Sequence, residues 1–215
     1  MSTPEPTVQD GQGGDERSEP SEGAYGRVGD AERRGDGTSV LVLAPTEAEA
    51  EARRAGAELL GRPADRPLRV LGVGVGTRAT DVVSGYRDHA AAGDRFALID
   101  VGPVGPRRET GPAVERVPDV TDLTGIGIRM TTALKEWDEG AIRICFDSLT
   151  PLVGHVEFER AYRFVDVMTT RVARVGAGHW HLDPRAHDDR TVHQVMSAFD
   201  AVVRRADGEW TVRGL

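Results

Sequence analysis

A strand sequence that ends in polar side chains is the first candidate for chemistry. The apolar run 141–146 is followed directly by Asp147, Ser148 and, one residue further, Thr150. Buried parallel strands deliver such side chains to the carboxyl edge of an α/β sheet, where these sheets bind ligands. In nucleotide-hydrolysing proteins an aspartate at this place helps to hold Mg²⁺ beside the phosphates. These three residues are our ligand-edge candidates, and the competing interpretation is an Asp/Ser cap on the next helix.

The partner of such a strand in nucleotide hydrolysis is a glycine-rich loop that ends in Gly-Lys-Ser or Gly-Lys-Thr. The chain contains no such loop, and its single lysine, Lys135, falls inside a predicted helix. The sequence therefore argues against phosphoryl transfer and favours a protein that is not an enzyme.

A glycine-rich stretch offers an alternative site. Gly72, Gly74 and Gly76 end a predicted strand, and the last two form a G-x-G-x-x-A spacing with Ala79. Asp100 ends the next strand about twenty residues later, where a dinucleotide- or adenosylmethionine-binding fold places a ribose-binding carboxylate. This pattern predicts an adenosyl-cofactor enzyme as the alternative, against a simple glycine-rich strand end.

A histidine-rich strand offers a third possibility. His179, His181 and Asp183 alternate along one predicted strand, so their side chains point to the same side. Two imidazoles and a carboxylate suit zinc or iron, with His187 or His155 as a further ligand. The competing interpretation is a set of polar residues near a strand end that form hydrogen bonds with a neighbouring loop.

The elements that must position these residues alternate between strand and helix from Ser39 onward. Thr46 and Glu49 predict a capping box at the first helix. The alternation predicts a three-layer α/β fold, with a mostly parallel sheet covered on both faces and a C-terminal β-hairpin. The predicted strands are 39–44, 68–75, 95–101, 142–146 and 176–182, the hairpin is 199–204 with 209–212, the helices are 46–60, 79–92, 121–137, 156–174 and 188–198, and a long loop covers 102–118.

Composition sets the domain organisation. Residues 1–38 are rich in Gly, Glu, Ser and Pro and almost free of apolar residues, so we expect a disordered acidic tail followed by one domain over 39–215. A net charge of −8 argues against a surface that binds nucleic acid. There is no secretory signal and no apolar run long enough for a membrane span, which predicts a cytoplasmic protein. The lone Cys145 lies in an apolar strand, where a cysteine acts as a small buried hydrophobe.

Six segments carry a family resemblance over residues 39–215: CFDSLTPL from Cys145, YRFVDVMTTRV from Tyr162, GHWHLDP from Gly178, AHD from Ala186, FDAVV from Phe199 and DLTGIGI from Asp122. They resemble an uncharacterised family of haloarchaeal proteins that is similar to a degenerate branch of the RecA/KaiC-type ATPases. The resemblance implies a P-loop NTPase-like fold in which Asp147 matches the metal-associated acid. The phosphate-binding loop of that fold would follow strand 39–44, where this chain reads Pro-Thr-Glu-Ala-Glu-Ala.

The sequence thus favours a non-hydrolysing RecA/KaiC-like regulatory or protein-interaction module. We expect no cofactor, and an unknown protein partner or a homo-oligomer in place of nucleic acid or membrane. The alternatives are the adenosylmethionine- or dinucleotide-dependent enzyme and the metal-binding protein. Topology separates the RecA/KaiC-like module from the cofactor-dependent enzyme. In a RecA-like sheet we expect strand 39–44 to lie beside the strand that ends in Asp147.

Overall fold

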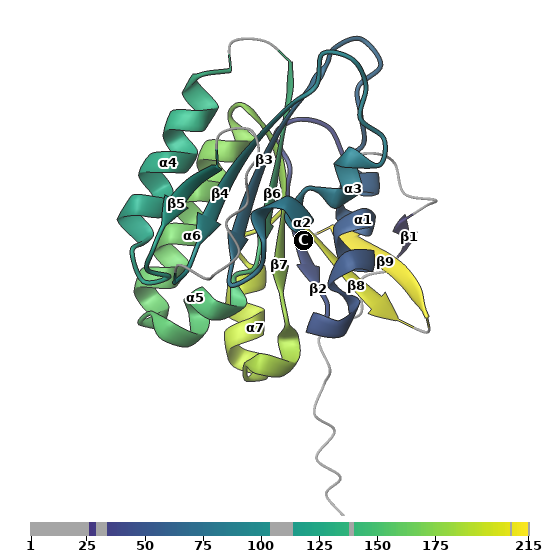
Figure 1. The fold of residues 1–215 in the computed structure, drawn as a ribbon. Coiled ribbons are helices and arrows are strands. Elements are labelled where there is room, and N and C mark those ends of the chain that lie inside the picture. The colour runs from purple at the N-terminus through teal and green to yellow at the C-terminus, as the bar shows by residue number, and fades with distance from the viewer. Residues whose placement is uncertain (1–25, 29–33, 104–113, 138–139, 207, 215) are drawn as a thin grey trace, which may run out of the picture.

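The computed structural model describes residues 26–28, 34–103, 114–137, 140–206 and 208–214. These residues form a nine-stranded sheet in the order β1-β9-β8-β2-β7-β6-β3-β4-β5 (Figure 1). The strands are β1 (Gly26–Arg27), β2 (Ser39–Leu43), β3 (Leu68–Val75), β4 (Arg95–Val101), β5 (Val114–Val117), β6 (Ala141–Asp147), β7 (Gly176–Leu182), β8 (Ala201–Ala206) and β9 (Glu209–Gly214). All pairs from β8 to β5 are parallel, whereas β9 pairs with β8 and β1 in the antiparallel sense.

Helices cover both faces of the sheet (Figure 1). The α-helices are α1 (Glu49–Leu60), α2 (Ala79–Val82), α3 (Ser84–Arg87), α4 (Leu123–Lys135), α5 (Thr150–His155), α6 (Phe158–Ala173) and α7 (Asp189–Met196), with 3₁₀ turns at Thr46–Ala48 and Pro184–Ala186. In the largest apolar cluster, helices α4, α5, α6 and α7 pack against one face of the sheet. In two smaller clusters, α1, α2 and α3 pack against the other face. The predicted three-layer, mostly parallel architecture with a C-terminal hairpin is confirmed.

The sequence explains the central elements directly. Every residue of β6 is buried, as expected for a strand with a helical layer on each side. Along α6 the buried residues include Ala161, Val165, Met168 and Val172, at spacings of three and four that form one apolar face.

The strand order corrects one topological expectation. β2 lies between β8 and β7, so β7 separates it from β6 and the expected direct contact is wrong. Two strands, β7 and β6, also separate β2 from β3. In the doubly wound dinucleotide-binding order the first and second strands are neighbours. The whole sheet therefore does not follow that order, although β3 and β4 do lie side by side.

Three local predictions are also wrong. β5 forms within the predicted loop 102–118 because it adds a parallel strand to β4. The predicted helix 79–92 consists of the two four-residue helices α2 and α3. The predicted capping box is absent, because the chain enters α1 through a 3₁₀ turn and Thr46 bonds elsewhere.

The predicted tail is partly included in the fold. β1 pairs with β9, and Val28 is 5% exposed in the apolar cluster beneath α1. Asp36 forms ion pairs with Arg143 and Arg66. The expectation of disorder is therefore wrong for residues 26–28 and 34–38, while residues 1–25 and 29–33 lie outside the described part. Among the described residues, no helix combines the length and apolar character that crossing a membrane requires.

Candidate functional site

The ligand-edge aspartate forms a buried ion pair. Asp147 ends β6 with 1% exposure, and its Oδ2 accepts a hydrogen bond from Nε of Arg53 on α1 at 2.5 Å. Nη2 of Arg53 donates to Oε2 of Glu49, one turn earlier on α1, at 2.8 Å. Burial raises the pKa of Asp147, and the Arg53 guanidinium opposes that rise. Burial likewise raises the pKa of Glu49, helped by the neighbouring charge of Asp147.

Intrachain contacts also occupy the segment between β2 and α1. The Asp183 carboxylate accepts hydrogen bonds from the backbone N–H and hydroxyl of Thr46, at 2.9 and 3.0 Å, and from the Arg185 N–H at 2.9 Å. Burial alone would raise the pKa of Asp183, but these bonds outweigh it and lower that pKa. Arg185 in turn pairs with Glu47. Acidic side chains thus hold the place where the resemblance puts a phosphate-binding loop.

The other two ligand-edge candidates have partners within the chain. The hydroxyl of Thr150 accepts a hydrogen bond from the Asp183 N–H at 2.9 Å. The hydroxyl of Ser148 accepts one from the Thr150 N–H at 3.3 Å. Thr150 is the first residue of α5, so its bond to Asp183 ties the segment after β6 to the end of β7. The Asp/Ser cap that the sequence offered as the competing interpretation is not formed, because the N-cap of α5 is Leu149 without a side-chain cap bond and Asp147 pairs with Arg53.

Two of the three predicted metal ligands meet, and a cysteine joins them. Cys145 and His179 are register partners on β6 and β7, and His181 follows on the same face. Sγ of Cys145 lies 3.6 Å from Nδ1 of His179 and 4.0 Å from Nε2 of His181, and these two nitrogens are 2.8 Å apart. Asp183 is not part of this cluster, because the chain turns at Pro184 and its carboxylate bonds to Thr46. The cluster of Cys145, His179 and His181 is called the Cys–His–His cluster below.

Burial keeps the Cys–His–His cluster uncharged. It lowers the pKa of His179 well below its ordinary value, helped by the neighbouring His181. Burial, with the positive charge of Arg53, lowers the pKa of His181 to about 3. Burial also raises the pKa of the Cys145 thiol, as does the charge of Asp147. Two neutral imidazoles and a thiol therefore lie side by side in the core.

Helix α1 packs directly against the Cys–His–His cluster, and Gly56 is the residue of α1 that contacts the His179 ring. A Cβ at Gly56 would lie 2.6 Å from Nδ1 of His179, so a larger residue would collide with the ring. The Tyr86 ring packs against the same imidazole at 5.7 Å between centroids. The outer ring nitrogens, Nε2 of His179 and Nδ1 of His181, are buried without a protein partner, as is Oδ1 of Asp147.

The glycines of the alternative cofactor site have a packing explanation. A Cβ at Gly72 would lie 2.5 Å from Cγ1 of Val83, and one at Gly74 would lie 2.6 Å from the Thr77 carbonyl oxygen. Both glycines therefore let the turn that carries α2 approach β3 closely. Gly76 has φ +74°, a conformation that favours glycine.

The acidic residue of that alternative lies beside the glycines. Asp100 on β4 is the register partner of Gly74, and its carboxylate lies 3.7 Å from the Arg116 guanidinium. The strand pair is thus formed as the sequence predicted. The helix that follows β3, α2, has only four residues, and its N-terminus approaches the glycine backbone directly. An adenosyl-cofactor site here remains a prediction.

Sequence reasoning missed two central residues. Arg53 sits in an Ala- and Glu-rich helix, where its spacing of four from Glu49 looked like an ordinary surface pattern. Cys145 precedes Asp147 by two residues, so both project from the same face of β6. That alternation was the available signal, but the strand order was needed to bring His179 beside it.

The family follows from a match over residues 37–205. The chain belongs to DUF7504, a family of unknown function. None of the curated proteins matches it significantly. The DUF7504 chain has 10% identity and a TM-score of 0.55 to the structure of PH0250 from Pyrococcus horikoshii OT3, covering 81% of this chain and 85% of that one.

Two further solved structures match the chain at low identity. The KaiC-like protein PH0186 from Pyrococcus horikoshii OT3 matches with 13% identity and a TM-score of 0.50, over 84% of this chain and 80% of that one. The flagellar accessory protein FlaH from Methanocaldococcus jannaschii matches with 9% identity and a TM-score of 0.45, over 88% and 81%. The two matches with TM-scores of 0.50 or more are at 10% and 13% identity, so they show the fold alone, which is the RecA/KaiC, P-loop NTPase-like α/β fold.

Proposed function

We propose that this DUF7504 chain is a non-hydrolysing RecA/KaiC-like module that binds an acidic segment of a partner protein. The observation that carries the first half is the buried Arg53–Asp147 pair. Removing one member of such a pair leaves an uncompensated charge and costs about 3–5 kcal/mol. A Mg²⁺ ion that displaced Arg53 from Asp147 would meet a cost of this kind.

The surroundings of Asp147 oppose phosphate as well. Thr46 donates both its N–H and its hydroxyl to Asp183, so these donors are already used. Glu47 and Glu49 lie in the same segment, and carboxylates repel a triphosphate where a lysine would attract it. This charge arrangement supports a module that does not depend on nucleotide hydrolysis.

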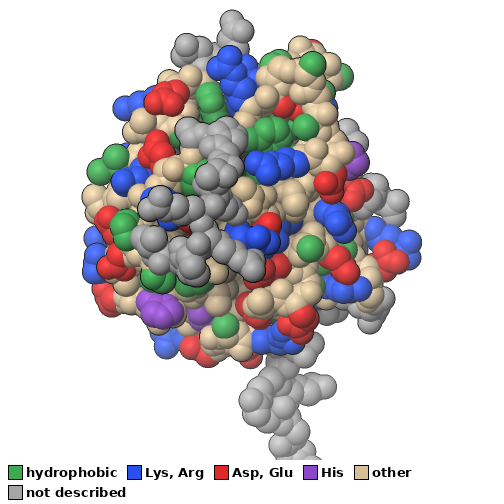
Figure 2. All heavy atoms as spheres, in the orientation of Figure 1, with side chains coloured by type: hydrophobic (Ala, Val, Ile, Leu, Met, Phe, Trp, Pro, Cys, Tyr) green, Lys and Arg blue, Asp and Glu red, His purple; other side chains and the backbone are tan. Residues whose placement is uncertain are grey.

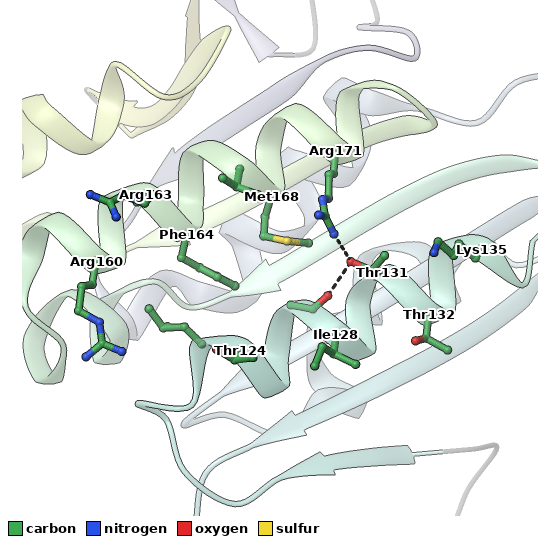
Figure 3. A pocket seen from close by; sticks show the side chains of 13 residues that line it. Thr124, Ile128, Thr131, Thr132, Lys135, Arg160, Arg163, Phe164, Met168 and Arg171 are labelled. Atoms are coloured by element: carbon green, nitrogen blue, oxygen red, sulfur yellow. Dashed lines mark hydrogen bonds between the residues drawn. The ribbon is translucent and has the colours of Figure 1, made fainter.

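A groove between α4 and α6 supports the second half of the proposal (Figure 3). The groove has a volume of about 600 Å³. Its centre contains Phe164 and Met168, and the apolar side chains of Ile128 and Val167 are 60% and 44% exposed at its edge. Exposed large apolar side chains that gather around one hollow are typical of interaction sites.

The charges that line this α4–α6 groove are all positive. Lys135, Arg160, Arg163 and Arg171 contribute the cations, and no acidic residue in the described part of the chain lines it. Within the described part of the chain none of the four forms an ion pair; Arg171 donates to the Thr131 hydroxyl at 2.7 Å. On the face seen in Figure 2, where it is not hidden by the grey atoms, acidic and basic side chains are instead interspersed.

This combination favours one class of occupant. An apolar centre between two helices accepts the apolar face of an amphipathic helix, with anchors at spacings of three and four. Cations around the centre complement Asp or Glu on the flanks of that helix and steer its approach. We therefore assign the groove to an acidic amphipathic helix of a partner protein.

The groove is tested with synthetic peptides and the full chain. The probe is a fluorescent helical peptide with Leu anchors and Glu flanks, compared with a version that carries Lys flanks. We expect the Glu-flanked peptide to bind and the Lys-flanked peptide not to bind. The double variant Arg160→Glu with Arg163→Glu should weaken binding of the Glu-flanked peptide at least about tenfold. The charge-matched control, Arg174→Glu with Arg190→Glu, should leave binding unchanged. Equal binding of the Lys peptide, or tighter binding of a single-stranded oligonucleotide at the groove, would refute the assignment.

The non-hydrolysing half is tested separately. We expect no Mg²⁺-dependent ATP turnover above the level of the Asp147→Asn variant, because no positioned cation faces a γ-phosphate. Turnover in the wild-type chain that Asp147→Asn abolishes, with Asp183→Asn retaining it, would show that Asp147 holds a catalytic metal.

A further inference from the structure

We infer that Cys145, His179 and His181 form a buried binding site for a single d¹⁰ cation, Zn²⁺ or Cu⁺. This assignment is independent of the α4–α6 groove, which lies on the opposite face of the sheet. It also differs from the sequence-based metal prediction, because Cys145 replaces Asp183 as the third ligand.

Geometry is the first argument for this site. The three donor atoms form a triangle with sides of 2.8, 3.6 and 4.0 Å. The point equidistant from all three atoms lies about 2.1 Å from each, close to the ~2.0–2.1 Å of a Zn–N bond and a few tenths below the ~2.3 Å of a Zn–S bond. A Zn–S bond of ordinary length would require the sulfur to move outward by a few tenths of an ångström.

The donor set is the second argument. Imidazole and thiolate together suit zinc and copper, whereas Mg²⁺ and Ca²⁺ require oxygen ligands. His179 and His181 each place a ring nitrogen within 4.0 Å of the Cys145 sulfur. The Cys145 thiol must lose its proton to bind, and a coordinating cation removes that proton outright.

The surrounding charges are the third argument. Asp147, Glu49 and Arg53 together carry one net negative charge when ionised. A thiolate adds a second negative charge, so a divalent cation makes the group of side chains neutral, although Glu49 is 31% exposed. Oδ1 of Asp147 is buried without a protein partner, and Asp147 follows Cys145 on the same face of β6. Asp147 is not grouped with the three donor atoms, so its charge acts on the site from outside the ligand set.

The competing explanation is a hydrogen-bonded core cluster. The 2.8 Å contact between His179 and His181 can be a hydrogen bond, with the thiol as a weak neighbour. That arrangement leaves buried ring nitrogens on both histidines without a protein partner. Metal on the inner nitrogens would leave the same outer nitrogens without a protein partner, so these atoms do not distinguish the two explanations, and the metal titration decides between them.

Metal titration of the full-length chain tests the assignment. Chelator-treated protein is titrated with Zn²⁺ in air and with Cu⁺ under anaerobic conditions, and bound metal is measured by elemental analysis. We expect one ion per chain with one of the two metals and a higher melting temperature in its presence. Cys145→Ser and His181→Gln should each weaken binding by at least about a hundredfold, more than the loss of an outer-shell partner does.

Matched controls and a second readout keep the test decisive. Asp183→Asn, which removes the ligand predicted from sequence alone, and His193→Gln on the exposed side of α7 should bind metal as the wild type does. Circular dichroism checks that each variant is folded. Substituted Co²⁺ should give a thiolate-to-cobalt charge-transfer band in the wild-type chain, and Cys145 is the only thiol of the sequence that can produce it.

Two results would overturn the assignment. One is a chelator-treated wild-type chain that takes up neither Zn²⁺ nor Cu⁺ and gives no cobalt–thiolate band. The other is undiminished one-to-one binding in the folded Cys145→Ser variant. Either result identifies the Cys–His–His cluster as a hydrogen-bonded part of the core.

Discussion

The guanidinium of Arg53 and the carboxylate of Asp147 lie 2.5 Å apart, and their side chains are only 7% and 1% exposed. Arg53 comes from α1, the helix that follows β2, and Asp147 ends β6, which is two places away from β2 in the sheet. The pair therefore ties one helical layer to the centre of the sheet. It also brings a cation to the edge where a nucleotide-hydrolysing relative would hold Mg²⁺.

Breaking this ion pair should be costly. We expect Arg53→Met to lower the free energy of unfolding by about 3 kcal/mol or more, because Asp147 would keep a buried charge without a partner. Chemical denaturation measures the change. The double variant Arg53→Met with Asp147→Leu should recover much of the loss, since neither charge remains. A single variant as stable as the wild type would show that Asp147 is protonated or has another partner.

Substitution of Gly56 should destabilise the protein although it lies inside a helix. Alanine usually stabilises a helix interior by about 0.5–1 kcal/mol relative to glycine. At Gly56 the added Cβ would meet the His179 ring at 2.6 Å, so we expect Gly56→Ala to lower the melting temperature. Gly127→Ala in α4 is the matched control, because its Cβ would meet nothing closer than 3.7 Å. It should raise the melting temperature, and equal effects of the two changes would contradict this packing.

Asp36 should contribute to stability although the sequence placed it in a disordered tail. Arg143 is 2% exposed and donates to Asp36 at 2.7 Å. Because Arg143 also donates to backbone carbonyl oxygens, we expect Asp36→Ala to cost about 2 kcal/mol rather than the full penalty of an unpaired buried charge. Asp65→Ala, at an exposed position nearby, should stay within about 0.5 kcal/mol of the wild type. Urea denaturation of both variants decides the point.

Acid should weaken the protein partly through Asp94. Burial alone would raise its pKa, but hydrogen bonds from Arg62 and from the N–H groups of Ala91 and Leu68 lower it from 3.8 to about 2. A lowered pKa in the folded state stabilises that state above the unfolded pKa, and the benefit is lost as the pH falls through the folded pKa. The stability difference between the wild type and Asp94→Asn should thus be constant above pH about 5 and shrink between about 4 and 2. Denaturation curves across this range measure it, and a difference independent of pH would contradict the role of Asp94.

The sequence by itself determined the architecture and one half of the site. Strict burial of β6 and the amphipathic pattern of α6 are local properties, so they can be read from residue order alone. The position of Asp147 at a strand end and the lack of a lysine after β2 are of the same kind. They sufficed to predict an α/β sheet with a ligand edge and without a phosphate-binding loop.

Only the tertiary structure decided which side chains meet. Strand order depends on packing between distant segments, so nothing near Cys145 in the sequence indicates that β7 lies beside β6 and supplies His179. The role of Arg53 also depends on tertiary structure. An arginine four positions after a glutamate predicts a surface ion pair, and only the packing of α1 on the sheet brings Arg53 to Asp147. Asp183 illustrates the opposite error. It continues the alternation of His179 and His181, but the chain turns at the end of β7 and Thr46 offers two hydrogen-bond donors there, so its carboxylate faces away from the histidines.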